Sequence, residues 1–231
     1  MKTIGLIGGM SWESSLEYYR IINERIKARL GGFHSAKAIL YSVDFAEIET
    51  LQQQGKWPET AQILSRAAKS LEAAGADFLV LCTNTMHKVV AEIESAVRIP
   101  LLHIADATAR DVSSRGLKKI GLLGTRFTME EDFYKGRLTQ KYGLEVFVPG
   151  PSDREVIHRV IYEELVFGRI DPSSRQQFVQ IIDRLAGGGA EGVILGCTEI
   201  GLLVKDGDSP LPLFDTTRIH AEAAADLALE P

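Results

Sequence analysis

Cysteine is scarce in this chain of 231 residues, which contains only Cys82 and Cys197. The two lie far apart, and residues 1–9 contain too short an apolar run for a secretion signal. A structural disulfide is therefore not expected, because such bonds form mainly in exported proteins. Each cysteine needs its own explanation, either as a small buried residue or as a reactive thiol.

Long apolar runs are also missing, so we expect no membrane-spanning segment and a cytoplasmic location. The formal net charge is −5 and the basic residues form no stripe, which argues against nucleic acid as a partner. The five histidines show no metal-ligand spacing with each other or with the cysteines, so no metal is expected. With 45% hydrophobic and 25% charged residues, the composition is that of an ordinary folded protein.

The sequence does contain an internal repeat with a period of about 115 residues. Three apolar, strand-like runs in the first half have counterparts in the second half, in the same order. The matched pairs are residues 2–9 with 118–125, residues 75–81 with 189–195, and residues 99–106 with 211–215. The repeat predicts two copies of one structural unit.

Segments with helical periodicity lie between these runs, and strands that alternate with helices indicate parallel sheets. We therefore expect an α/β fold of two similar lobes, each a parallel sheet flanked by helices. A pseudo-twofold axis would relate the lobes, with the active site in the cleft where the loops after the strands converge. The repeat assigns residues 1–107 to the first lobe and 108–217 to the second, while a last helix within 218–231 could return to the first.

Two polar motifs follow the second pair of repeated runs. Extending the match places residues 82–85, Cys-Thr-Asn-Thr, opposite residues 196–199, Gly-Cys-Thr-Glu, so Thr83 corresponds to Cys197. Each motif lies at a predicted strand end, before a predicted helix N-terminus whose amides can bind a carboxylate. The glycines at 8 and 9 follow another strand, but they do not form the dinucleotide-binding fingerprint.

Three motifs together resemble the aspartate/glutamate racemase family: Gly8-Gly9-Met10-Ser11-Trp12, Thr83-Asn84-Thr85-Met86-His87 and Gly196-Cys197-Thr198-Glu199. The resemblance covers nearly the whole chain. It implies a cofactor-independent racemase that interconverts L- and D-amino acids without pyridoxal phosphate and binds a small-molecule amino-acid substrate. Family members are often dimeric, so a homodimer is one possible state of this chain. In this family one cysteine removes the α-proton as a thiolate, and the other donates a proton to the opposite face.

The chain departs from the family pattern at Thr83, where members typically have the first catalytic cysteine. A threonine hydroxyl is far less acidic than a thiol, so Thr83 can donate a proton but is a poor resting base. A helix N-terminus can lower the pKa of a thiol, which suits Cys197 as the base. Strand alternation turns Cys82 to the other face, where we expect a small core residue. The hypothesis is efficient turnover of the L-enantiomer and poor turnover of the D-enantiomer, with the equilibrium unchanged.

The catalytic pair is thus Thr83 and Cys197, and further residues are expected to bind the substrate. These are Met10, Ser11, Gln52, Asn84, Thr85, Thr125, Thr198 and Glu199. Several have plain structural alternatives. Met10 and Ser11 could simply pack in a turn, and Glu199 could favour a helix N-terminus through the dipole. His87 could be a proton relay, or it could be a helix-surface or helix-capping residue.

The substrate side chain is harder to infer. Family members that handle aspartate often have an arginine after the second strand and a lysine after a Tyr-Glu motif, and here those regions read Gln52 and residues 161–166. The segment 52–56 is predicted to be a loop. A replacement positive charge could come from Lys88, Arg126 or Arg169.

Two alternatives to a racemase stay open. One is a related cysteine-dependent isomerase or decarboxylase of the same fold, and the other is a non-catalytic amino-acid-binding protein. Exchange of the substrate α-hydrogen with solvent separates these functions, because a racemase must show it and a binding protein must not.

Overall fold

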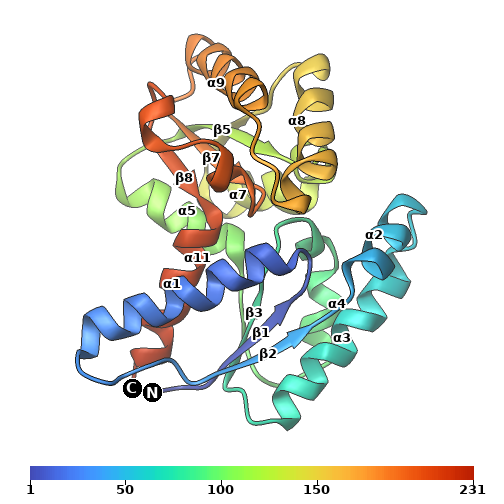
Figure 1. Cartoon of the computed structure of the whole chain (residues 1–231), viewed down its shortest axis with the longest axis vertical. Coiled ribbons are helices and arrows are strands. Elements are labelled where there is room, and N and C mark those ends of the chain that lie inside the picture. The colour runs from blue at the N-terminus through green and yellow to red at the C-terminus, as the bar shows by residue number, and fades with distance from the viewer. The chain divides into compact units, whose positions relative to one another are not determined.

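The computed structural model describes all residues, 1–231, and contains two four-stranded parallel sheets. The chain divides into two compact units: unit 1 is Met1–Ile104 with His220–Pro231, and unit 2 is Ala105–Ile219. The strand orders are β2-β1-β3-β4 in unit 1 and β6-β5-β7-β8 in unit 2, so the same topology occurs twice (Figure 1). The predicted α/β class with two similar lobes is confirmed.

Unit 1 contains the first four strands, and its helices cover both faces of the sheet. The strands are β1 (Ile4–Gly8), β2 (Ala38–Ser42), β3 (Phe78–Leu81) and β4 (Leu101–Leu102). The helices are α1 (Trp12–Leu30), α2 (Phe45–Gln53), α3 (Trp57–Ala73), the 3-10 helix η1 (Thr85–Val89), α4 (Val90–Ser95) and, from His220 on, α11 (Thr216–Leu229).

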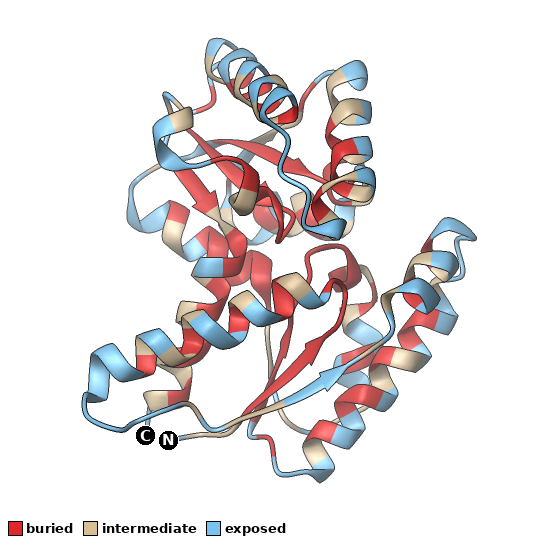
Figure 2. Ribbon diagram, in the orientation of Figure 1, coloured by how far each residue is buried: buried red, intermediate tan, exposed pale blue.

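The two central strands of unit 1 are buried on both faces (Figure 2). Ile7, Leu79 and Leu81 face a core that α2, α3 and α4 complete. Ile4 and Val80, on the other face, pack with α1 and with the alanine-rich side of α11. Parallel strands enclosed in this way need apolar residues at successive positions, which explains the continuous apolar runs in the sequence.

Unit 2 repeats the arrangement with more helix before its last strand. The strands are β5 (Lys119–Gly124), β6 (Glu145–Phe147), β7 (Gly192–Gly196) and β8 (Leu213–Asp215). The helices are α5 (Ile104–Ser114, whose first residue belongs to unit 1), α6 (Arg126–Glu130), α7 (Asp132–Tyr142), α8 (Pro151–Glu163), η2 (Leu165–Phe167), α9 (Pro172–Gly187), α10 (Ile200–Leu203) and η3 (Asp206–Asp208). One face of β5 and β7 packs against α8, α9 and α10.

Two local expectations were wrong. Gln52 and Gln53 do not lie in a loop, because Asp44 caps α2 and the helix continues to Gln53. The apolar run at 99–106 is not a long strand, since β4 has two residues and α5 begins at Ile104.

The last helix, α11, brings the two ends of the chain together in unit 1. The Lys2 amide donates to the Ala228 carbonyl at 2.8 Å, and Figure 1 shows the termini side by side. Arg25 of α1 forms two hydrogen bonds with Asp226 of α11. None of the helices is long and apolar enough to cross a membrane.

Candidate active site

The loop after β1 carries Met10 and Ser11, and a serine of the next helix holds it in place. Gly9 has φ of 93°, a conformation that glycine adopts without strain. Its amide donates to Ser15 Oγ at 2.8 Å, and Ser15 Oγ donates to the Ser11 carbonyl at 2.9 Å. Ser11 caps α1 by accepting from the Ser14 amide. Met10 and Ser11 are both buried at the carboxyl end of β1.

Cys82 directly follows β3 and lies on the same face of the sheet as Phe78 and Val80, as strand alternation predicts. Cys82 is fully buried in the core with Val80 and Tyr18, and burial raises the pKa of its thiol. Thr83, Asn84 and Thr85 follow it and are almost completely buried. The expectation that Cys82 is a small core residue is therefore confirmed.

His87 lies one turn beyond Thr83 and contacts its backbone. His87 Nδ1 is 2.8 Å from the Thr83 carbonyl oxygen, and the Ile104 amide donates to His87 Nε2 at 3.3 Å. The ring is stacked at a tilt on His103, with centroids 4.3 Å apart. The helix-surface alternative for His87 is therefore wrong, because the side chain is buried and binds the backbone of the candidate catalytic residue.

Gln52 reaches the same end of the sheet from α2. Its side-chain amide lies 2.9 Å from Met86 Sδ, and Gln52 is buried. Within unit 1 the structure thus collects the predicted residues from three segments at the carboxyl ends of β1 and β3. These residues are Met10, Ser11, Gln52, Thr83, Asn84 and Thr85.

Unit 2 places its predicted residues after β5 and β7 in the same way. Thr125 caps α6, accepting from the Thr128 amide at 3.3 Å. Cys197, Thr198 and Glu199 follow β7 and are all buried. Because β5 and β7 are neighbouring parallel strands, these four residues lie at one edge of the sheet.

Cys197 and Thr198 both donate to one carboxylate oxygen. Cys197 Sγ is 3.0 Å from Glu199 Oε2, and Thr198 Oγ1 is 2.8 Å from the same atom. Burial raises the pKa of the Cys197 thiol well above its usual value, and the charge and hydrogen bond of Glu199 raise it further. Hydrogen bonds from the amides of Glu199 and Ile200 act in the opposite direction but are weaker. Cys197 is therefore a neutral thiol that donates to a carboxylate.

This electrostatic setting corrects one expectation. The predicted lowering of the thiol pKa by a helix N-terminus was wrong, since α10 has only four residues and burial outweighs its amides. The motif in unit 1 likewise precedes a five-residue 3-10 helix rather than a long α-helix. Neither motif has a strong helix dipole behind it.

The candidate replacement charges lie in varied surroundings. Lys88 Nζ sits 3.8 Å from the centre of the Trp57 ring, while Arg126 and Arg169 are exposed. In the segment 161–166, where some family members have a lysine, Glu164 accepts a hydrogen bond from Ser174 Oγ at 2.7 Å. A role for any of the three basic residues as the anchor of the substrate side chain stays a prediction.

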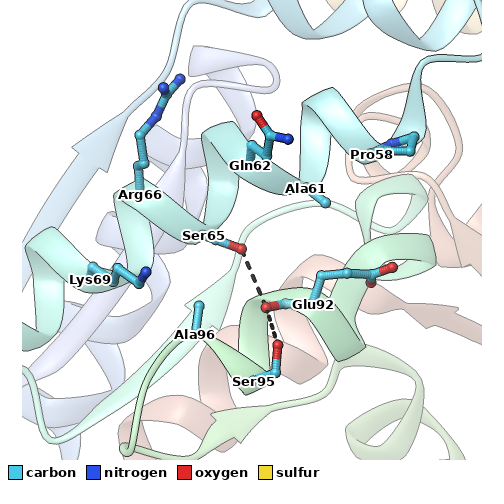
Figure 3. Close-up of a pocket in the computed structure, with 9 residues that line it drawn as sticks. All are labelled: Pro58, Ala61, Gln62, Ser65, Arg66, Lys69, Glu92, Ser95 and Ala96. Carbon is cyan, nitrogen blue, oxygen red and sulfur yellow. Dashed lines mark hydrogen bonds between the residues drawn. The ribbon is translucent and has the colours of Figure 1, made fainter.

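A pocket of about 610 Å³ lies away from all these residues. It runs between α3 and α4 and is lined by Arg66, Lys69, Glu92 and polar or small neighbours, with Ser65 and Ser95 both donating to the Glu92 carbonyl (Figure 3). It contains none of the predicted site residues. No three His, Cys, Asp or Glu side chains are placed to hold a metal ion.

Sequence reasoning missed the hydroxyl groups that hold the motif loops. In unit 1 these are Ser14, which donates to the Cys82 carbonyl at 3.5 Å, and Ser15. In unit 2, Thr216 donates to the Leu195 carbonyl at 2.8 Å and Thr217 to the Thr198 carbonyl at 3.2 Å. The sequence does contain a signal for them, because two adjacent hydroxyl residues lie near the start of α1 (Ser14 and Ser15) and at the start of α11 (Thr216 and Thr217).

Comparison with known proteins supplies an independent finding. The model of the Asp/Glu/hydantoin racemase family matches residues 7–224. The chain is 60% identical to a candidate Asp/Glu racemase from Yersinia pestis, with a TM-score of 0.93 and 100% of both chains covered. An aspartate racemase homologue from Pyrococcus horikoshii is 39% identical, with a TM-score of 0.86 and 100% of both chains covered. The broad specificity amino-acid racemase RacX of Bacillus subtilis is 25% identical over 172 residues, which cover 71% of this chain and 70% of that protein.

Proposed function

We propose that this chain, which belongs to the Asp/Glu/hydantoin racemase family, is a cofactor-independent amino-acid racemase with Cys197 and Thr83 as its acid/base pair. Cys197 removes the α-proton of an L-amino acid of the aspartate or glutamate type, and Thr83 acts on the opposite face of the α-carbon. The observation that carries the proposal is the thiol of Cys197 donating to Glu199, with a hydroxyl at the equivalent position of unit 1.

The first step is the activation of the thiol. Glu199 Oε2, 3.0 Å from the sulfur, is the group placed to accept the thiol proton. The resulting thiolate is stabilised by the amides of Glu199 and Ile200, and it is strongly basic because the site is buried. In this step a thiol that is neutral in the free protein becomes the base of the reaction.

The next steps move two protons on opposite faces of the substrate. The thiolate takes the α-proton and becomes a thiol again, and the carbanion takes a proton from the Thr83 hydroxyl. Glu199 then releases its extra proton to solvent, while the Thr83 alkoxide regains one from solvent. Hydrogen bonds from Asn84, Thr85 and Thr198 to the substrate carboxylate would stabilise the charge that develops in the transition state.

Because Cys197 and Thr83 differ in acidity, we expect the L- and D-enantiomers to differ in kcat and KM but not in kcat/KM. Two enantiomers have equal free energies, so the ratio kcat/KM must be the same for both directions. The preference therefore appears as a higher kcat, with a correspondingly higher KM, for the L-enantiomer. It also appears as exchange without inversion, because Cys197 can return a solvent proton to the face from which it took one.

The test is deuterium incorporation at the α-carbon of L- and D-aspartate and L- and D-glutamate in D₂O, followed by NMR, with inversion followed by chiral chromatography. We expect L-substrates to exchange faster than they invert, and D-substrates to exchange no faster than they invert. Cys197→Ser should abolish both signals, and Thr83→Cys should bring the inversion rate close to the exchange rate.

Two results would overturn the proposal. Folded wild-type protein that binds an amino acid without any exchange is a binding protein, and release of carbon dioxide identifies a decarboxylase. Inversion that persists in Cys197→Ser would remove Cys197 from the mechanism. A homodimer is part of the same proposal, and light scattering of the purified protein measures it directly.

A further inference from the structure

We infer that His87 is a positioning residue for Thr83: it holds the Thr83 backbone so that the hydroxyl is aligned with the α-carbon. The inference rests on the proposed function, because it assigns a role in proton transfer at Thr83. His87 contacts the backbone carbonyl of Thr83, and no direct contact between His87 and the substrate is proposed.

The two hydrogen bonds of the imidazole determine its tautomer. The Ile104 amide can only donate, so His87 Nε2 is the unprotonated, accepting nitrogen. The Thr83 carbonyl can only accept, so His87 Nδ1 carries the hydrogen and donates across 2.8 Å. The ring is therefore neutral and connects the loop after β3 to the first residue of α5.

The surroundings hold this ring in one orientation. His87 is almost fully buried and is stacked on His103. Its edge meets the ring of His220, whose Nε2 donates to the Leu102 carbonyl at 2.8 Å and whose Nδ1 accepts from the Tyr18 hydroxyl at 2.8 Å. Buried histidines with satisfied nitrogens form a rigid support, because any rotation would break a buried hydrogen bond.

The effect on Thr83 follows from its backbone contacts. The Thr83 amide donates to the Leu81 carbonyl at 2.8 Å, and its carbonyl accepts from His87. With both backbone groups held, rotation about one side-chain bond is the main freedom left to the hydroxyl. A weak acid must be well aligned to act, and a displacement of about 1 Å can reduce such a rate by on the order of 100-fold. Steps on the Cys197 side need no such support from His87.

The experiment compares two amide replacements of the imidazole. In His87→Asn the side-chain nitrogen takes the place of Nδ1 and can still donate to Thr83, whereas in His87→Gln the amide reaches the place of Nε2 and that donor is lost. For L-aspartate in D₂O we expect His87→Gln to lower inversion roughly 10- to 100-fold while exchange changes less than about twofold. His87→Asn should recover most of the inversion rate. Thermal unfolding of each variant verifies that it is folded.

The outcomes separate this inference from the proposed function. If inversion and exchange fall together in His87→Gln, the histidine is a general structural residue and the inference is wrong. An unchanged ratio of inversion to exchange in that variant also contradicts it. If His87→Gln does not fold, His87→Ala is measured with and without added imidazole: recovery of inversion with exchange unchanged supports the inference, and no recovery contradicts it. Wild-type protein that shows no exchange at all refutes the proposed function instead.

Discussion

At the scale of single residues, the environment of Cys197 determines what the thiol can do. Burial raises the thiol pKa most and Glu199 raises it further, and in the proposed mechanism Glu199 is also the group that takes the thiol proton. These effects oppose each other in the free protein, because a nearby negative charge disfavours a thiolate. The carboxylate is therefore expected to suppress the reactivity of the resting thiol while making it available for proton transfer.

Replacing Glu199 by Gln tests this dual role. Removing the charge should lower the Cys197 pKa, so alkylation of the thiol by iodoacetamide should become faster at a given pH. Exchange of the substrate α-hydrogen should nevertheless fall by on the order of 10²- to 10⁴-fold, because the proton acceptor is gone. Cys82 provides the internal control, since its complete burial should keep it unmodified in both proteins. Slower alkylation in the variant would contradict the assignment.

At the scale of elements, the short connections after the central strands position the site. The loop after β1 turns at Gly9 and is held by Ser15, while the loop after β3 is held by Ser14 and His87. In unit 2 the corresponding supports come from Thr216 and Thr217 at the start of α11. The proposed catalytic residues thus lie in loops whose backbone is held by hydrogen bonds, and the helix dipoles contribute little.

Gly9→Ala should strongly destabilise the first loop. Gly9 has φ of 93°, and an added Cβ would lie 2.6 Å from the Val43 nitrogen and closer still to the Val43 carbonyl oxygen. The strained φ alone costs about 1–3 kcal/mol, and the contact with rigid backbone adds to it. Urea unfolding measures the loss.

Gly187→Ala is the matched control for that change. Gly187 ends α9, and an added Cβ there would meet nothing within 4 Å. The control should match the wild type or gain about 0.5–1 kcal/mol, because alanine loses less entropy in a helix. Equal stabilities for Gly9→Ala and wild type would show that the loop after β1 tolerates a different backbone.

At the scale of the whole molecule, α11 begins in unit 2 and ends in unit 1. Its alanines pack with Ile4 and Tyr18, and His220 lies at the point where the helix enters unit 1. Burial lowers the pKa of His220 to about 4. The C-terminal segment is thus part of the first hydrophobic core and not an appendage.

The shifted pKa of His220 predicts a pH dependence of stability. In the unfolded chain the imidazole binds a proton near its ordinary pKa of about 6.5, while in the folded chain it stays neutral down to about 4. The contribution of neutral His220 is therefore fully present above about pH 6.5 and is lost as the pH falls towards 4. The slope is about 1.4 kcal/mol per pH unit, so unfolding at pH 5 should require about 2 kcal/mol less than at pH 7.

His220→Gln isolates this contribution from the other titrating groups. A glutamine can still donate to the Leu102 carbonyl, but it does not titrate. Urea unfolding at pH 7 and pH 5 should show a smaller difference for the variant than for the wild type. The same difference in both proteins would mean that another group causes the acid destabilisation.

The repeated strands were predictable because parallel strands covered on both faces require continuous apolar runs. The edge strand β2 is mostly apolar but was not predicted, because its sequence does not match that of its counterpart β6 and the repeat therefore did not reveal it. Gln52 was placed in a loop because its polar neighbours look like one, although Asp44 starts a helix that includes it. The supporting residues His103 and His220 gave no signal, because isolated histidines in apolar segments have no characteristic spacing.

The sequence by itself determined the repeat, the α/β class and the equivalence of Thr83 with Cys197, because these depend on the order and spacing of residues along the chain. Only the tertiary structure decided that Cys197 is a neutral thiol against Glu199 and that His87 holds the Thr83 backbone. The pKa of a thiol and the tautomer of an imidazole depend on removal from water and on atoms within about 3 Å. Chain folding sets those distances, and spacing in the sequence does not.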